Sequence, residues 1–252
     1  MNRRRLSFLL LGSFVFAHFA RADQYEGLTP SEKRQYLETC IAPPPTKGPG
    51  LYATDRTLCW DTGDTLTVQF LDGSPENAAF VLATAAEWTR YANIKFVQVK
   101  TGGTIRVSFS GRGFQSRLGR EASNILPENP TMNLGFASGP PGDWKRHVLH
   151  EFGHVLGFAH EHQSPDAAIP WDRQKVIEYF QGLREPWTVQ RIERNVLNPQ
   201  PPTKNGTWTK FDRLSIMLYP VSPDLTRDHT GYGFNKELSA LDKSKAAEVY
   251  PR

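Results

Sequence analysis

Alternating apolar and polar positions predict four short strands in the first half of the chain. In the first of them, Leu66, Val68 and Phe70 alternate with threonine and glutamine, the pattern of a strand with one buried face. The other three combine apolar positions with β-branched and aromatic residues, which favour strands. The predicted strands are 65–70, 94–99, 104–109 and 132–136.

Helical spacing of apolar positions predicts helices between and after these strands. The first begins at Ser74-Pro75, a typical helix start, and places Ala78, Val81 and Ala85 on one face. Four more are predicted to begin after residues that can cap a helix, which are Asp143, Asp172, Thr188 and Ser239, the last in a capping box with Asp242. Strands and helices in this order predict a mixed α/β (α+β) fold with helices packed on a sheet.

The beginning of the chain has the composition of a targeting segment. Three arginines at 3–5 precede an apolar run from Leu6 to Ala20, and Ala20-Arg21-Ala22 resembles a cleavage signature. We therefore expect a secretory signal over residues 1–22 and an extracellular protein. The alternative, a membrane anchor, is weaker because polar residues interrupt a run that is already short. Residues 23–59, which include a proline- and glycine-rich stretch, are expected to form an N-terminal extension or propeptide.

Removing residues 1–22 changes the charge balance. The full chain has 30 basic and 26 acidic residues, and this segment holds four of the arginines and no acid. The remainder is balanced, so it gives no reason to expect a nucleic acid or an anionic membrane as partner. Its oligomeric state is not indicated by any feature of the sequence. The two cysteines, Cys40 and Cys59, are expected to form a disulfide, and the alternative is that one is an inhibitory metal ligand.

One segment carries a metal-binding pattern, HExxHxxGxxH, from His150 to His160. His150 and His154 are four residues apart and lie on one face of a helix, so both imidazoles can reach one metal ion. Gly157 permits a left-handed turn, which brings His160 round as a third ligand. Three histidines and an open position predict a catalytic zinc ion. Glu151 is placed to take a proton from a zinc-bound water.

A second motif, Ser215-Ile216-Met217-Leu218-Tyr219-Pro220, lies about sixty residues downstream. A methionine turn after the long histidine motif is the signature of the metzincin zinc peptidases, which this chain resembles. It is most similar to the astacin-like branch, through residues 157–161, the Ser-Ile-Met-x-Tyr turn, the segment 238–242 and Tyr250-Pro251. The resemblance runs from about Trp60 to the C-terminus.

The resemblance implies a zinc endopeptidase with a metzincin-type catalytic domain over residues 60–252. An upper half, about 60–157, would hold a twisted sheet with helices. A lower half, about 158–252, would be irregular and partly helical. The zinc cleft would lie between the two halves.

The resemblance also implies individual roles. Tyr219 is expected to ligate zinc and to swing to the transition state, and Met217 to form the floor beneath the metal. Glu161 corresponds to a glutamate that meets the processed N-terminus in the family. The strand before the zinc helix, 133–136, is expected at the sheet edge, where an extended protein or peptide substrate would add. The chain departs from the branch at Leu218, usually histidine, in the residues after Glu161, and in its cysteine pattern.

These residues predict peptide hydrolysis by metal-activated water, with Glu151 as general base and Tyr219 stabilising the oxyanion. Two alternatives stay open. One is a non-catalytic binding protein on the same scaffold, in which the glutamate or a ligand should have been lost. The other is a zinc hydrolase of a cell-wall peptide cross-link, which the motif residues do not distinguish. The neighbouring His147 and His162 are expected to be solvated surface residues, and the alternative is that either supports a metal ligand without binding the metal.

Overall fold

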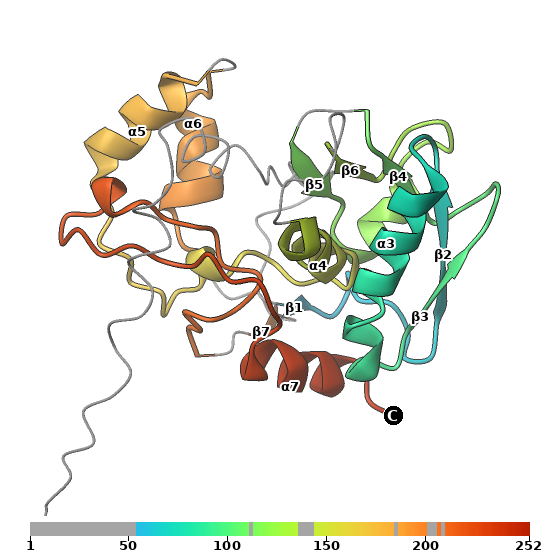
Figure 1. Ribbon diagram of the computed structural model, residues 1–252. Helices are drawn as coiled ribbons and strands as arrows, with labels where there is room; N and C mark the ends of the chain where they lie inside the picture. The colour runs from blue at the N-terminus through green and yellow to red at the C-terminus, as the bar shows by residue number, and fades with distance from the viewer. Residues whose placement is uncertain (1–53, 111–112, 136–143, 184–185, 201–205, 208–209) are drawn as a thin grey trace, which may run out of the picture.

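A computed structural model describes residues 54–110, 113–135, 144–183, 186–200, 206–207 and 210–252. Five strands form one mixed sheet in the order β3-β2-β4-β6-β5 (Figure 1). Their bounds are β2 Thr65–Phe70, β3 Lys95–Gln98, β4 Ile105–Ser108, β5 Phe114–Ser116 and β6 Met132–Leu134. Only β5 is antiparallel to its neighbour. The four predicted strands are confirmed, except that Phe136 lies outside the described residues.

The sheet order corrects the expected position of the edge strand. β6, which holds most of the predicted segment 133–136, is paired on both sides, with β4 and with β5. The edge strand is β5, whose Gln115 is opposite Asn133. The prediction was wrong because β5 has only three residues and follows a glycine-rich stretch, which indicates a loop. Strand order also depends on tertiary pairing, which the hydropathy pattern does not contain.

The predicted helices are present, and the three predicted caps Ser74, Asp172 and Thr188, together with the capping box at Ser239, are confirmed. Ser74, Asp172 and Thr188 each accept a hydrogen bond from a first-turn backbone N–H, and Ser239 forms the capping box with Asp242. The helices are α3 Pro75–Ala85, α4 Trp144–Val155, α5 Arg173–Gln181, α6 Val189–Ile192 and α7 Ala240–Val249. Asp143, the predicted cap of α4, lies outside the described residues. No described helix is long and apolar enough to span a membrane.

Short elements connect these helices and strands. Four are 3₁₀ turns, η1 Trp88–Arg90, η2 Gly119–Asn124, η3 Glu161–Gln163 and η5 Pro223–Leu225. A π-helical turn, η4 Glu193–Leu197, continues α6. The remaining two, β1 Thr54–Asp55 and β7 Gly206–Thr207, pair with each other.

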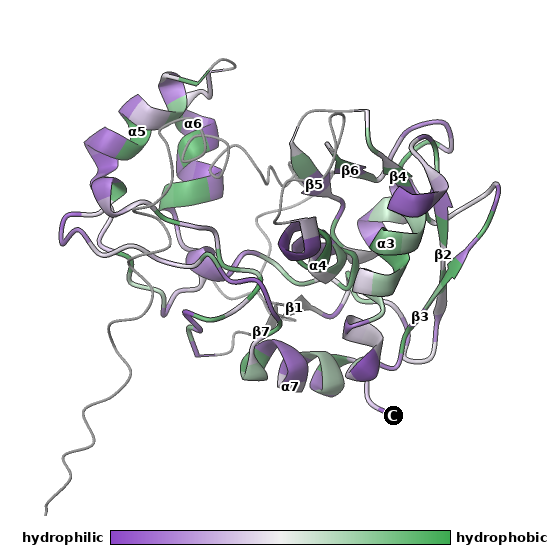
Figure 2. Ribbon diagram, viewed as in Figure 1, coloured by the Kyte–Doolittle hydropathy of each residue, from purple (hydrophilic) through white to green (hydrophobic). Residues whose placement is uncertain are grey.

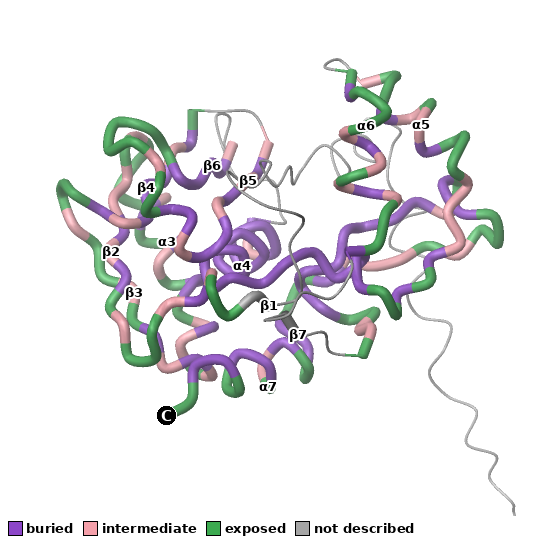
Figure 3. Tube along the Cα trace, turned by 180° about the vertical axis from the view of Figure 1, so that it is seen from behind, coloured by how far each residue is buried: buried purple, intermediate pink, exposed green. Residues whose placement is uncertain are grey.

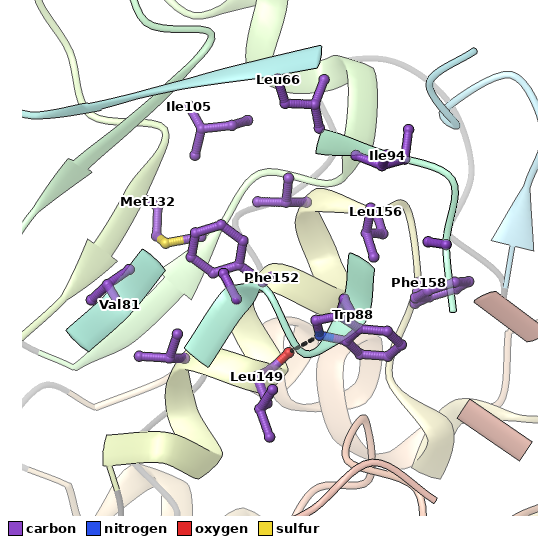
Figure 4. Close-up of a cluster of buried hydrophobic side chains, with 14 of the residues drawn as sticks. Leu66, Val81, Trp88, Ile94, Ile105, Met132, Leu149, Phe152, Leu156 and Phe158 are labelled. Carbon is purple, nitrogen blue, oxygen red and sulfur yellow. Dashed lines mark hydrogen bonds between the residues drawn. The ribbon is translucent and has the colours of Figure 1, made fainter. Parts of the chain in front are cut away.

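The main hydrophobic cluster fills the space between the sheet, α3 and α4. Figure 4 shows Trp88 beside α4, where its indole N–H donates to the Leu149 carbonyl at 2.9 Å. Phe152 lies at the centre and meets Phe96 edge to face, with ring centroids 5.0 Å apart. Each such fully buried side chain contributes roughly 1.5–3 kcal/mol. Every residue of α4 except Lys145 is buried, so the helix runs through the interior (Figure 3).

A second hydrophobic cluster stands apart from the sheet. It joins α5 and α6 through Val176, Phe180, Trp187, Ile192 and Val196. Figure 2 shows hydrophilic and hydrophobic positions mixed along α5, as expected of a helix with one buried face. In Figure 1, α4 lies between this cluster and the sheet, and its contacts with α3, β5 and β6 are on the sheet side.

The segment before β2 fastens the C-terminal end of α4. Trp60 donates its indole N–H to the Val155 carbonyl at 2.7 Å, and Arg120 donates to the carbonyls of Leu58 and Cys59. Carbonyls in the last turn of a helix lack partners within it, so the Trp60 bond stabilises the end of α4, and the Arg120 bonds hold the segment that carries Trp60. Cys59 is buried beside Gly157. Cys40 and the expected signal lie outside the described residues, so the disulfide stays a prediction.

Candidate active site

The zinc helix α4 positions the first two histidines. His150 and His154 are each 1% exposed, on one face of the helix as predicted. Their Nδ1 atoms lie 2.7 Å from the carbonyl oxygens of Ile216 and Phe158 respectively. Because a carbonyl only accepts, each Nδ1 carries the proton. Each Nε2 therefore keeps its lone pair, which is the arrangement found in histidine metal ligands.

The third histidine arrives through the turn at Gly157. This glycine has φ +88°, a conformation that side-chain-bearing residues rarely adopt, and it ends the helix as predicted. The turn is closed by the Phe158 N–H, which donates to the Gly153 carbonyl at 3.0 Å. His160 is thereby placed with its Nε2 3.1 Å from that of His154. The potential ligand atoms of the three histidines lie within 4.8 Å of one another.

The donor set fits a zinc ion. Tetrahedral zinc with nitrogen ligands at 2.0–2.1 Å places these nitrogens about 3.3 Å apart, close to the observed His154–His160 separation. The Nε2 of His150 is buried and has no hydrogen-bond partner among the described residues. A buried polar atom without a partner is costly, and a metal ion at this point would satisfy it. The three histidines therefore form the zinc site that the sequence predicts.

Burial keeps the ligands neutral. It lowers the pKa of His154 to about 4, against a weaker opposing effect of the Phe158 carbonyl. Burial also holds the pKa of His150 and of His160 well below the usual range, and the neighbouring histidines add to this shift. Neutral imidazole is the form that binds zinc, so the site is ready for metal near neutral pH.

The methionine turn lies directly against the zinc helix. Met217 is buried, and a Cβ placed on Gly153 would overlap its sulfur atom and approach Trp88 to 3.2 Å. A side chain on this glycine, which lies between Glu151 and His154, would therefore displace the Met217 side chain from the helix. Sequence analysis did not identify Gly153, because this constraint arises from a contact between segments far apart in the chain.

Three side chains hold the methionine turn in place. Asp242, at the start of α7, accepts hydrogen bonds from the Ser215 hydroxyl at 2.7 Å and from the Ile216 N–H at 2.8 Å. Arg146, one turn before His150, donates to the Leu218 carbonyl at 3.2 Å. His150 holds the Ile216 carbonyl, as described above. The turn is thus tied to both α4 and α7, and Arg146 is a further residue that sequence analysis missed.

Tyr219 lies among the histidines, as the resemblance implied. It is 6% exposed, and its ring centroid is 4.4 Å from that of His160 and 6.4 Å from that of His150. Glu151 is fully buried on α4 between the two helical ligands. The structure therefore brings all five predicted site residues together.

Two neighbouring histidines correct an expectation. His147 and His162 are not solvated: they are 7% and 3% exposed. His147 is stacked on Phe114 of β5, with ring centroids 3.8 Å apart, and His162 is stacked on Tyr219. The surface interpretation rested only on the usual location of histidine. Their burial results from the edge strand and from the lower half of the molecule, both of which fold over α4.

A small pocket opens beside Glu161, with Met217 and Trp88 among its lining residues. The Glu161 carboxylate accepts a hydrogen bond from the Asp212 N–H at 2.8 Å. Burial raises the pKa of Glu161 to about 8 and raises that of Asp242. The lining is Trp88, Phe158, Ala159, Glu161, Asp212, Ser215, Met217, Leu241, Asp242 and Lys245. The lining therefore combines three carboxyl groups with the ammonium group of Lys245.

Comparison with known proteins agrees with this site. No family model matches the chain, and no curated protein matches it. A solved structure of myroilysin is 38% identical, with a TM-score of 0.75, covering 79% of this chain and 98% of that one. A second myroilysin structure is 34% identical, with a TM-score of 0.65, covering 89% and 97%. High choriolytic enzyme 1, a hatching enzyme zinc-protease from the medaka fish Oryzias latipes, is 18% identical, covers 77% and 94%, and shares the fold with a TM-score of 0.53.

The fold and the three-histidine site together define a metzincin zinc endopeptidase of the astacin-like type. Within that class, the identity over nearly the whole of the solved relative shows that the chain belongs to the myroilysin family. The predicted fold class, enzyme class and zinc ion are confirmed.

Proposed function

We propose that this zinc endopeptidase is secreted and cleaves extended protein or peptide substrates, with Glu151 as the general base. The observation that carries the proposal is the position of Glu151. It is fully buried on α4 between two histidines whose Nε2 atoms face the third ligand. A carboxylate at this position on the helix lies close to the place where a zinc ion would hold a water molecule.

The proposed reaction divides the work among a few groups. A zinc ion held by His150, His154 and His160 would supply a Lewis acid, which lowers the pKa of a bound water to about 7. Glu151 would act as the base that accepts a proton from the attacking water and as the acid that returns it to the leaving amine. The Tyr219 hydroxyl would donate a hydrogen bond to the developing oxyanion.

The edge strand β5 is the proposed binding site for the substrate main chain. It packs on the zinc helix through the Phe114–His147 stack, and in the described part of the sheet its outer edge has no partner strand. An extended peptide can add to such an edge through main-chain hydrogen bonds. A peptide inhibitor with N-methylated backbone amides is therefore expected to bind more weakly than its unmethylated parent, and equal inhibition constants would exclude this binding mode.

The pocket beside Glu161 is the proposed receptor for the processed N-terminus. Burial raises the pKa of Glu161, and a terminal amine bound beside it would favour its ionised form and pair with it. Glu161→Gln is expected to lower the melting temperature of the processed form and to change the unprocessed form much less. N-terminal sequencing of the enzyme from the culture medium would test secretion, and it would show whether residues 23–59 are removed.

Hydrolysis of casein with and without a chelator is the direct test of the function. Activity should disappear on chelation and return with zinc. The His154→Ala variant should lose zinc in metal analysis, and undiminished zinc would contradict the ligand assignment. Peptidoglycan assayed in parallel addresses the alternative of a cell-wall cross-link hydrolase. A non-catalytic binding protein is disfavoured because the glutamate and all three ligands are assembled.

A further inference from the structure

His162 lies two residues beyond the third zinc ligand, outside the HExxHxxGxxH pattern. Only 3% of it is exposed. Its ring is stacked on the Tyr219 ring, with centroids 4.5 Å apart and planes 14° from parallel. The Tyr219 ring also contacts that of His160. The phenol ring of Tyr219 therefore lies between the zinc ligand His160 and a histidine that has no ligand role, with the ring of His150 further away at 6.4 Å.

The orientation of His162 is fixed from the lower half of the molecule. Its Nε2 lies 3.0 Å from the carbonyl oxygen of Asn195 in the π-helical turn η4. Because a carbonyl only accepts, this nitrogen carries the proton and donates it. The next residue, Gln163, donates to the Arg194 carbonyl of the same turn at 2.7 Å. Two consecutive side chains thus fasten the segment after His160 to η4, and π-helical turns are frequent at functional sites.

Besides Tyr219, the His162 ring contacts that of His160, with centroids 5.3 Å apart and planes tilted by 33°. Trp171 meets its ring edge to face, with centroids 6.5 Å apart. Its Nδ1 is buried and has no hydrogen-bond partner among the described residues. A phenylalanine at this position would therefore keep the stacked face and lose the single N–H bond to Asn195.

We propose that His162 is a positioning residue that holds the phenol of Tyr219 in the orientation from which it acts on the transition state. The proposal rests on the function proposed above for Tyr219. Stacked aromatic pairs favour their geometry by roughly 2- to 10-fold over unstacked ones. Loss of the stacking partner should reduce the productive population of Tyr219 by a similar factor. This reduces kcat, while KM, which depends on other substrate contacts, stays nearly constant.

The test is a set of variants assayed with a fluorogenic peptide at equal zinc content. His162→Leu, which removes the aromatic face, is expected to lower kcat by roughly 3- to 10-fold and to change KM by less than about twofold. His162→Phe should recover most of kcat. His162→Asn keeps an N–H donor for the Asn195 carbonyl but lacks the ring, and it should resemble His162→Leu. Loss of zinc in both ring-less variants would indicate a structural role and overturn the proposal.

A double-mutant cycle separates positioning from other effects. In a Tyr219→Phe background there is no hydroxyl to orient, so His162→Leu should change kcat by less than about twofold. The same reduction in both backgrounds would overturn the proposal. Trp187→Leu, in the hydrophobic cluster of α5 and α6, is the matched control for general loosening of the lower half. It should lower the melting temperature and leave kcat nearly unchanged; an equal fall in kcat would also overturn the proposal.

The two proposals fail in different ways. If Tyr219→Phe leaves kcat unchanged, the role of Tyr219 is wrong, and the positioning role of His162 falls with it. If Tyr219→Phe lowers kcat but His162→Leu does not, only the positioning proposal is wrong.

Discussion

The two parts of the molecule that meet at the zinc site are built in different ways. α4 supplies His150, Glu151 and His154 from one regular helix that is buried on nearly all sides. His160 and Tyr219 come from irregular segments whose positions depend on individual side-chain-to-backbone hydrogen bonds. Packing therefore fixes the first group, whereas separate polar contacts fix the second.

This difference predicts two kinds of variant. Substitutions on α4 remove a chemical group but leave its neighbours in place, because the helix and the main hydrophobic cluster hold them. Substitutions in the irregular segments also shift the residues that follow, because each anchor holds a whole turn. Substitutions on α4 should therefore have the largest effects on activity. Substitutions in the irregular segments should have the largest effects on stability and on the positions of neighbouring residues.

The largest expected effect is that of Glu151→Gln. The change keeps the shape of the side chain, so fold and zinc content should persist, but it removes the group that accepts and donates the proton. General acid–base assistance is worth roughly 10²- to 10⁴-fold in rate, and kcat should fall by that factor. Glu237→Gln is the control, because Glu237 is exposed and forms an ion pair with Lys145, which lies on α4 like Glu151. Turnover within threefold of wild type for Glu151→Gln would exclude the general-base role.

Tyr219→Phe should have the next largest effect. The hydroxyl acts mainly in the transition state, so kcat should fall by roughly 10- to 10³-fold, with less change in KM. Zinc should stay bound, because three histidines hold it. Tyr232→Phe removes a hydroxyl elsewhere in the same half and should leave kcat unchanged. An unchanged kcat for Tyr219→Phe would reduce this residue to a packing role.

The same contrast explains how much the sequence predicted. Periodicity and caps identified β2, α3, α4 and α7, because these elements follow local rules. The histidine spacing predicted the zinc site because one helix and one glycine turn determine it. β5 was missed because it is short and follows glycines, and its edge position depends on pairing with β6.

The residues that support the site were harder to predict, since they act across long sequence separations. Arg146 donates to the Leu218 carbonyl, and Asp242 accepts from Ile216, in each case across many residues of sequence. The capping box at Ser239 and Asp242 was predicted, but not the second use of the same carboxylate. His162 was taken for a surface residue because only the tertiary fold buries it.

Asp242→Asn tests the anchoring of the irregular part. The carboxylate accepts from Ser215, Ile216 and Ser239, and an amide would direct its N–H₂ group at one of these donors. A buried donor left without an acceptor costs about 1–3 kcal/mol, so the free energy of unfolding should fall by this amount. Ser239→Ala, which removes only the other half of the capping box, is the control and should lose about 1 kcal/mol. Equal losses in chemical denaturation would mean that Asp242 contributes only as a helix cap.

The smallest expected effect is that of Gly153→Ala, at the point where the two parts touch. Alanine favours a helix by up to about 1 kcal/mol over glycine, so α4 alone would be stabilised. The new methyl group would instead overlap the Met217 sulfur and approach Trp88, and such overpacking costs about 1–3 kcal/mol. The net change in unfolding free energy should therefore be a loss of up to about 2 kcal/mol. The cost should shrink in a Met217→Ala background, where the sulfur is absent. A variant that is more stable than wild type would show that the Met217 side chain moves aside at little cost, so that its contact with α4 is not tightly packed.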